Sequence, residues 1–95
     1  MLPPEWATWK NIIYFYVYKN EITGTLPVSY ASWTGIVDFY THTNRMSGTL
    51  PKEYQSWEKI EDVRIQNNAY EGLFPSERGT WNTLRKLYIE NNKLT

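Results

Sequence analysis

The sequence predicts an α/β-type solenoid, in which one short structural unit is repeated and stacked along a single axis. The chain aligns with itself without a gap at an offset of 24 residues, giving units 2–25, 26–49, 50–73 and 74–95, of which the last is incomplete. Proline, tryptophan and asparagine recur at the same place in every unit, and apolar residues alternate with polar ones between them. One such unit cannot bury its apolar face alone, so stacking must build the core.

The length and composition limit the classes of function that this chain can have. Its 95 residues make one small domain, 1–95. The 10 basic and 10 acidic residues balance to a net charge of zero, which gives no reason to expect nucleic acid or an anionic membrane as a partner. There is no cysteine, so disulfides and thiolate metal sites are excluded. No apolar run approaches the ~20 residues that a membrane span requires.

Each unit opens with a segment that we expect on the outer, convex side. Proline is the second residue of every unit, and it cannot donate to a central ladder of hydrogen bonds. The residues that follow place aromatic side chains three apart, which predicts a single 3₁₀-like turn. A tryptophan comes next and is expected to pack in the core, where it would bury ~150–250 Å². These tryptophans are Trp9, Trp33, Trp57 and Trp81.

A short strand is expected next, on the concave side. In the third unit the apolar residues are Ile60, Val63 and Ile65. The last two are two positions apart, which is the period of a strand with one buried face. Such a strand is roughly five residues long. Strands of neighbouring units would lie in parallel ~4.8 Å apart and form one sheet. Thr41 stands at one of the apolar positions, so it would need a local hydrogen-bond partner.

Asparagine and glycine close the unit. The asparagine side chain carries both a donor and an acceptor, so it can satisfy backbone groups that are freed where the chain turns inward. The glycine fits a position of positive φ or close backbone approach. The residues expected in these structural roles are Asn20, Asn44, Asn68 and Asn92, with Gly24, Gly48 and Gly72.

This pattern, x-x-L-x-x-L-x-L-x-x-N-x-L-x-G-x-L-P, resembles the leucine-rich repeat in its 24-residue subtype. Within that family, the Leu-Pro-Pro-Glu-Trp at 2–6 and the Gly-Thr-Leu-Pro-Lys-Glu-Tyr-Gln-Ser-Trp at 48–57 are similar to the repeats of trypanosomatid surface antigens. Plant receptor-type repeats are the near relatives. The resemblance implies a right-handed coil with an exposed parallel sheet on the concave face and 3₁₀ or irregular turns on the convex face. It also implies an extracellular or cell-surface setting and recognition by binding rather than chemistry.

Side chains on the solvent side of the sheet are the candidates for binding. The N-terminal half of this face is rich in tyrosine, which offers a large contact area at low entropic cost. Tyrosine also suits any half-exposed sheet, so a purely structural role stays open. The candidate binding residues are Tyr14, Tyr16, Tyr18, Asp38, Tyr40, His42, Asp62, Arg64, Gln66, Lys86, Tyr88 and Glu90.

No catalytic or metal site is expected. Asp38 and Asp62 share a position in neighbouring units, roughly 5 Å apart, a spacing that resembles the carboxylate pair of retaining glycosidases or a calcium site. Because the face is open and Arg64 and Lys86 lie nearby, we interpret both as ordinary surface charges. His42, the only histidine, is expected to be an exposed surface residue. No catalytic triad, phosphate loop or dinucleotide motif occurs, so we expect neither enzyme activity nor a cofactor.

Two functions follow from this pattern. The first is a recognition module that binds a protein or a glycan through the concave sheet. The second is a structural unit that stacks end to end, with itself or with further repeats, into a spacer or fibre. The stacking function is suggested by the ends of the chain. No polar capping repeat is visible there, and strand edges would be unpaired. Membrane attachment would need an anchor outside this segment.

Overall fold

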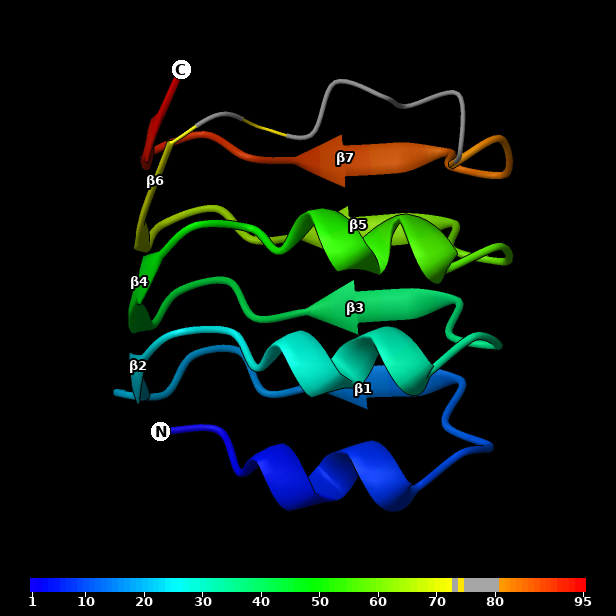
Figure 1. The fold of residues 1–95 in the computed structure, drawn as a ribbon. Helices are drawn as coiled ribbons and strands as arrows, with labels where there is room; N and C mark the ends of the chain where they lie inside the picture. Colours follow the sequence, from blue (N-terminus) through cyan, green and yellow to red (C-terminus); the bar gives the residue numbers. More distant parts are fainter. Residues whose placement is uncertain (73, 75–80) are drawn as a thin grey trace.

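The computed structural model describes residues 1–72, 74 and 81–95, and in it the chain winds into stacked coils. Figure 1 shows strands lying one above another, with the short helices in a column of their own. The outer turn of the fourth unit, at 75–80, lies outside the described residues.

The concave sheet holds one parallel strand from each coil, as the sequence predicted. Its strands, in spatial order, are β1 (Tyr14–Tyr16), β3 (Asp38–Tyr40), β5 (Asp62–Arg64) and β7 (Lys86–Tyr88). Paired residues are 24 apart, so Phe15, Phe39 and Val63 form one inward row. Each strand has three residues instead of about five, although backbone hydrogen bonds to the next coil continue to the residue of positive φ three positions later, as from the Val17 and Lys19 N–H groups.

A second sheet runs along the edge of the solenoid and was not predicted. It consists of β2 (Thr23–Gly24), β4 (Arg45–Gly48), β6 (Ala69–Gly72) and β8 (Lys93–Leu94), again all parallel. Its sequence signal is weak because strands this short bury few side chains; β4 buries only Met46. Gly24, Gly48 and Gly72 end its first three strands with φ of 93°, 82° and 83°.

In the described part of the chain, three 3₁₀ helices line the convex side, in agreement with the predicted turns. They are η1 (Pro4–Thr8), η2 (Val28–Ser32) and η3 (Lys52–Ser56). Each follows a proline whose φ lies between −63° and −70°, the value that its ring imposes. Each ends where a tryptophan N–H donates to the carbonyl three residues earlier, at 3.0 Å.

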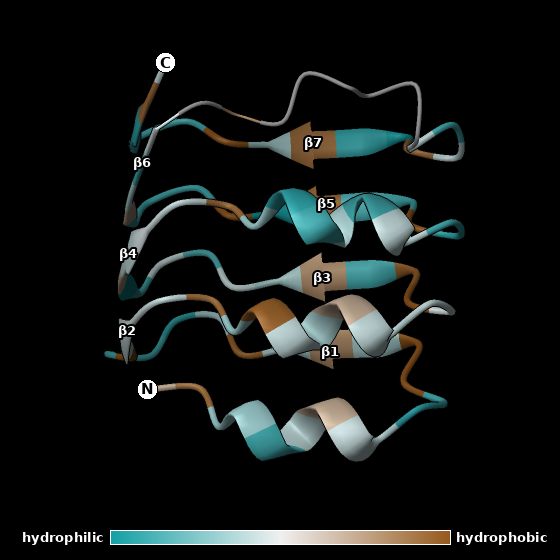
Figure 2. Cartoon of the chain, viewed as in Figure 1, coloured by the Kyte–Doolittle hydropathy of each residue, from teal (hydrophilic) through white to brown (hydrophobic). Residues whose placement is uncertain are grey.

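The core lies between the concave sheet and the helices. In Figure 2, β3 and β7 each carry a brown band beside teal residues, as expected of a strand with one buried face. Trp33, Trp57 and Ile60 are fully buried. The buried Thr41 is hydrogen-bonded to the Tyr70 hydroxyl at 2.9 Å, so its partner comes from the next coil rather than from its own neighbourhood.

Candidate functional site

Four tyrosines gather on the N-terminal half of the concave face. Tyr14 and Tyr16 flank the buried Phe15 on β1 and therefore point to solvent, with 60% and 50% of their surfaces exposed. The rings of Tyr16 and Tyr40 are 4.6 Å apart between centroids, and those of Tyr14 and Tyr16 are 6.1 Å apart. Tyr18 lies within 6.3 Å of both Tyr16 and Tyr40. We call Tyr14, Tyr16, Tyr18 and Tyr40 the tyrosine cluster.

Two of these tyrosines donate to aspartates on the next strand. The Tyr16 hydroxyl lies 2.6 Å from Asp38 Oδ2, and the Tyr40 hydroxyl lies 2.7 Å from Asp62 Oδ2. The bond to Asp38 is the main reason that the pKa of Tyr16 rises from 10.0 to about 12. Burial, followed by the bond to Asp62, also raises the pKa of Tyr40. Both hydroxyls therefore stay protonated donors at neutral pH.

Asp62 is not the ordinary surface charge that the sequence indicated. Only 7% of its surface is exposed, and Arg64 donates to both of its oxygens, from Nε at 3.0 Å and from Nη2 at 3.1 Å. Burial alone would raise the pKa of Asp62, but the hydrogen bonds from Arg64 and Tyr40 outweigh it and hold the pKa below 3.8. The Arg64 guanidinium also lies between two aromatic rings, 4.6 Å from Tyr40 and 4.8 Å from Tyr88.

His42 also differs from its expected place, since it is half-buried instead of exposed. Its ring stacks on Tyr18 at 4.7 Å, and its Nδ1 atom is buried without a hydrogen-bond partner among the described residues. Gln66 Oε1 is in the same situation. Burial is the main cause that lowers the pKa of His42 below 6.5, and the positive charge of Arg64 adds to it.

The remaining candidates lie at the C-terminal side of the sheet. Lys86, Tyr88 and Glu90 are exposed and lie outside the tyrosine cluster. A cavity of about 170 Å³ lies between the N-terminal and C-terminal halves of the concave face. It is lined by Asp38, Glu61, Asp62, Arg85 and Lys86. Glu61 and Arg85 are not among the binding residues predicted from the sequence; the position that they share holds Ile13 and Val37 in the first two units.

The described part of the chain contains no group of three or more residues placed to hold a metal ion. None of its helices has the length and apolar character that crossing a membrane demands.

The asparagines join the coils to one another. Asn44 Nδ2 donates to the carbonyls of Thr41 and Val17 at 3.0 and 2.9 Å, and its Oδ1 accepts from the backbone N–H groups of Asn20 and Ile22. Asn68 and Asn92 donate in the same way to their own coil and to the preceding one. The side-chain amide of Asn20, in the first coil, donates to the carbonyls of Val17 and Tyr18 in its own coil.

The tryptophans form a second set of links that the sequence analysis did not foresee. The indole Nε1 groups of Trp33, Trp57 and Trp81 donate to backbone carbonyls of the preceding coil at 3.0–3.1 Å. All three side chains are buried. Trp9 contradicts the core assignment, because 53% of its surface is exposed and its ring stacks on Trp6. Trp9 belongs to the first coil, so the described residues contain no earlier coil whose backbone carbonyl its indole could contact.

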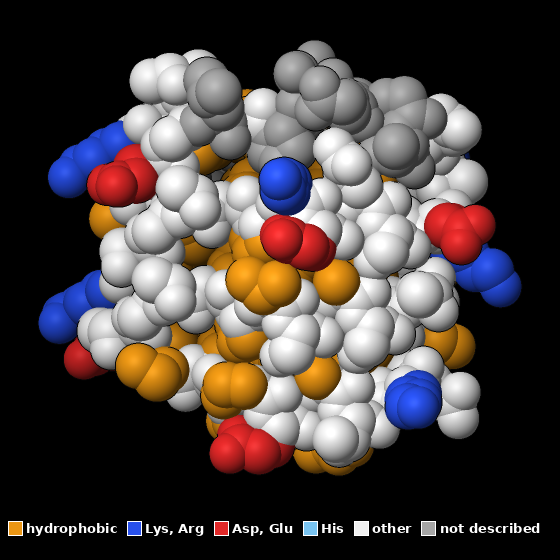
Figure 3. Space-filling model, viewed as in Figure 1, with side chains coloured by type: hydrophobic (Ala, Val, Ile, Leu, Met, Phe, Trp, Pro, Cys, Tyr) orange, Lys and Arg blue, Asp and Glu red, His pale blue; other side chains and the backbone are white. Residues whose placement is uncertain are grey.

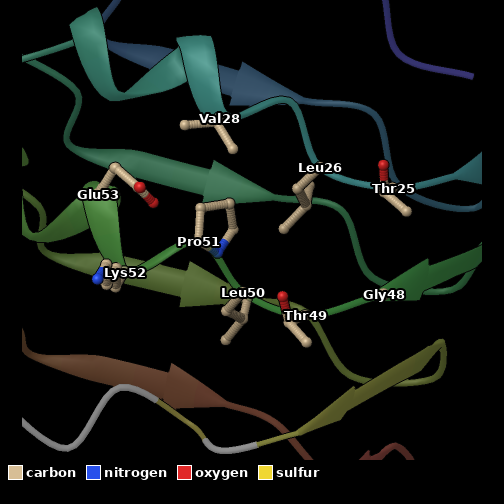
Figure 4. A pocket seen from close by; sticks show the side chains of 9 residues that line it. All are labelled: Thr25, Leu26, Val28, Gly48, Thr49, Leu50, Pro51, Lys52 and Glu53. Carbon is tan, nitrogen blue, oxygen red and sulfur yellow. The ribbon is translucent and has the colours of Figure 1, made fainter.

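The face seen in Figures 1 and 3 shows hydrophobic side chains in small patches, with charged side chains mostly toward the margins. An open groove of about 600 Å³ runs between the second and third coils. Figure 4 shows Leu26, Leu50 and Pro51 near its middle, with Lys52 and Glu53 at one side. It lacks the converging polar groups of a specific small-molecule site, so the concave face remains the better candidate.

The fold is that of leucine-rich repeat ectodomains of plant receptors. One neighbour is the ectodomain of the Arabidopsis thaliana receptor kinase GASSHO1/SCHENGEN3 in complex with CASPARIAN STRIP INTEGRITY FACTOR 2, with a TM-score of 0.95 and 25% identity over 98% of this chain and 11% of that chain. The plant peptide hormone receptor RGFR1 in complex with RGF2 has a TM-score of 0.95 and 27% identity, covering 98% and 15%. The Arabidopsis receptor kinase HAESA, in complex with the peptide hormone IDA and the co-receptor SERK1, has a TM-score of 0.91 and 25% identity, covering 98% and 15%.

This chain thus spans only 11–15% of the length of those receptor chains. No protein-family model matches the sequence, and no curated protein does.

Proposed function

We propose that this chain is a recognition module that binds a peptide or protein partner across its concave sheet. The observation that carries the proposal is the tyrosine cluster, in which aromatic rings remain half-exposed although they pack against one another. Exposed tyrosines held by a rigid scaffold offer contact area at little entropic cost, since their conformations are restricted before binding. A solenoid presents such residues on an extended concave surface.

The structural neighbours support a protein ligand. The receptors RGFR1 and HAESA and the GASSHO1/SCHENGEN3 ectodomain are each described in complex with a peptide or protein. We therefore favour a protein over a glycan as the partner class. An extracellular or cell-surface setting is part of the proposal, since these neighbours are receptor ectodomains or receptors. The similarity to trypanosomatid surface antigens remains a prediction from the sequence motif alone.

Selection of a displayed random-peptide library against the wild-type chain tests this function. Tyr14 and Tyr16 are the residues to change, because both are exposed, whereas loss of Tyr40 would break its bond to the buried Asp62. We expect selected peptides to bind the Y14A/Y16A variant at least roughly tenfold more weakly, as for the loss of two central aromatic contacts. Thermal stability should change little.

The matched control is V28A, which removes an equally exposed apolar side chain from the convex helix η2. It should leave peptide binding unchanged. Peptides that bind Y14A/Y16A as tightly as the wild type, or a selection that yields no binders, would contradict the proposal. If an array of glycans instead gave binding that depends on Tyr14 and Tyr16, the partner class would be wrong.

A further inference from the structure

The chain contains its own example of how this face holds a guanidinium. Asp62 accepts from the Tyr40 hydroxyl and, at the same time, from two nitrogens of Arg64. The Arg64 guanidinium lies against the Tyr40 ring. A tyrosine–aspartate pair with an adjacent aromatic ring therefore forms a complete site for an arginine side chain, through a forked ion pair and a cation–π contact.

The same tyrosine–aspartate pair occurs one coil earlier without its arginine. Tyr16 donates to Asp38 with the sequence separation of 22 that joins Tyr40 to Asp62. The position that corresponds to Arg64 is occupied by Tyr40, whose ring centroid lies 4.6 Å from that of Tyr16 with the two planes tilted by 36°. Among the described residues, Asp38 receives that one hydrogen bond and forms no ion pair within 4.0 Å.

Asp38 has β1 on one side and β5 on the other. Asp38 pairs in register with Tyr14, so the half-exposed rings of Tyr14 and Tyr16 border it there. On the other side Asp62 is its register partner, and the shared cavity continues to Glu61, Arg85 and Lys86. Arg85 and Lys86 repel a second cation, so an incoming positive charge is favoured over β1 and β3 rather than over β7.

We infer that the site formed by Asp38, Tyr14 and Tyr16 binds an arginine side chain of the peptide or protein partner, an inference that rests on the proposed function. The guanidinium pairs with the free Oδ1 of Asp38 and lies on the neighbouring tyrosine rings. Arginine suits this site better than lysine because its planar group can both fork to a carboxylate and stack on an aromatic face. The partner is thus expected to present an arginine near its contact with β1.

A titration of the wild-type chain with acetyl-Gly-Arg-Gly-amide, followed by NMR of the tyrosine rings, tests the inference. We expect the signals of Tyr14 and Tyr16 to shift. The matched probe in which citrulline replaces arginine keeps the shape but loses the charge. It should bind roughly tenfold more weakly, the usual scale for loss of a charged hydrogen-bonding group. A lysine probe should fall between the two.

Two variants test the residues. D38N keeps an acceptor for the Tyr16 hydroxyl but removes the charge, so it should weaken the arginine probe by a similar factor without affecting the citrulline probe. R64Y removes the internal guanidinium from Asp62 and recreates the pattern found at Asp38. It should therefore add a second binding event, visible at Tyr40. Equal binding of the arginine and citrulline probes, undiminished binding by D38N, or a folded R64Y variant with no second event would each contradict the inference.

The peptide selection separates this inference from the proposed function. Selected peptides that depend on Tyr14 and Tyr16, but carry no excess of arginine and ignore D38N, would leave the binding module intact and overturn the arginine site. A selection without binders would overturn the module itself.

Discussion

Buried side-chain donors hold each coil to the one before it. The indole of Trp57 donates to the Tyr30 carbonyl at 3.0 Å, and Tyr54 donates its hydroxyl to the Pro27 carbonyl at 2.6 Å. Both donors reach 27 residues back along the chain. Each of these carbonyls also accepts a backbone N–H of its own turn, so the side-chain donor supplies a second hydrogen bond to a buried acceptor. In this protein the aromatic residues therefore fill the core and also satisfy its backbone.

Replacing Trp57 by phenylalanine tests this double role. The W57F variant keeps an aromatic ring but removes the indole N–H donor and some volume, which leaves the Tyr30 carbonyl with only its bond from the Trp33 N–H. We expect a loss of about 2–4 kcal/mol in the free energy of unfolding. Urea unfolding followed by fluorescence measures it. W9F is the control, since Trp9 is exposed, and it should change stability by no more than about 0.5 kcal/mol. Similar losses in both variants would show that the buried donor contributes little.

The individual elements are too short to be stable alone. Each concave strand has three residues, and the strands of the second sheet have two to four. In each of the first three coils the backbone adopts positive φ twice, at a non-glycine residue such as Thr43 and at a glycine such as Gly48. At Gly48 the neighbouring coil also comes close, because an added Cβ would lie 2.7 Å from Thr25 Cγ2.

Gly48 should therefore be far less tolerant of alanine than Gly35. We expect G48A to lose about 2 kcal/mol, from the strained φ and the contact with Thr25 together. The φ of Gly35 lies outside the left-handed region, and no atom lies within 4 Å of a Cβ added to it. G35A should be neutral or stabilising by up to about 1 kcal/mol. Thermal unfolding of both variants measures the difference.

The double variant T25S/G48A separates the two causes. It removes the crowded methyl group but keeps the strained φ, so it should recover part of the lost stability relative to T25S alone. Equal stability of G48A and G35A would mean that the coil relaxes around the substitution at little cost.

At the scale of the whole molecule, the coils share one core and one charged face. The inward rows of the concave sheet continue from coil to coil, and Phe15, Phe39 and Trp57 contact one another in sequence. On the solvent side of this sheet, Tyr40 contacts Tyr16 of the preceding coil and Arg64 of the following coil. A change in charge on this face is therefore expected to affect the stability of the entire solenoid.

The free energy of unfolding should be highest between pH 6.5 and pH 10. The pKa of His42 is lowered by burial and by Arg64, so the unfolded chain binds a proton more readily, and stability falls as the pH drops below 6.5. The lowered pKa of Asp62 causes a further loss as the pH falls below 3.8. In contrast, the raised pKa values of Tyr16, Tyr40 and Tyr54 contribute stability that is lost as the pH rises above 10.0.

Urea unfolding at a series of pH values measures this profile. The H42Q variant should flatten it near pH 6 and leave the most acidic region unchanged, whereas D62N should do the reverse. Stability that rises as the pH falls from 7 to 5 would contradict the sign expected for His42.

Periodic features were accessible from the sequence, whereas the contacts of the candidate site were not. Four repeats of one pattern place the strand, the 3₁₀ turn and the positive-φ glycine because each depends on local periodicity and backbone preference. The same reasoning identified the tyrosines of the concave face. It misjudged His42, Asp62 and Trp9, whose exposure depends on how neighbouring coils pack.

The periodic sequence is enough to predict a leucine-rich repeat solenoid with an aromatic concave face. Repetition supports this prediction, because a residue that departs from the pattern in one unit can be compared with the equivalent residues of the other three units. Which side chains contact one another depends on how the coils pack in three dimensions. An offset of 24 places Asp38 beside Asp62, yet the hydroxyls of Tyr16 and Tyr40 reach diagonally across 22 residues. Those diagonal contacts depend on side-chain conformation and on the lateral offset between coils. The 24-residue repeat of the sequence does not reveal either of these.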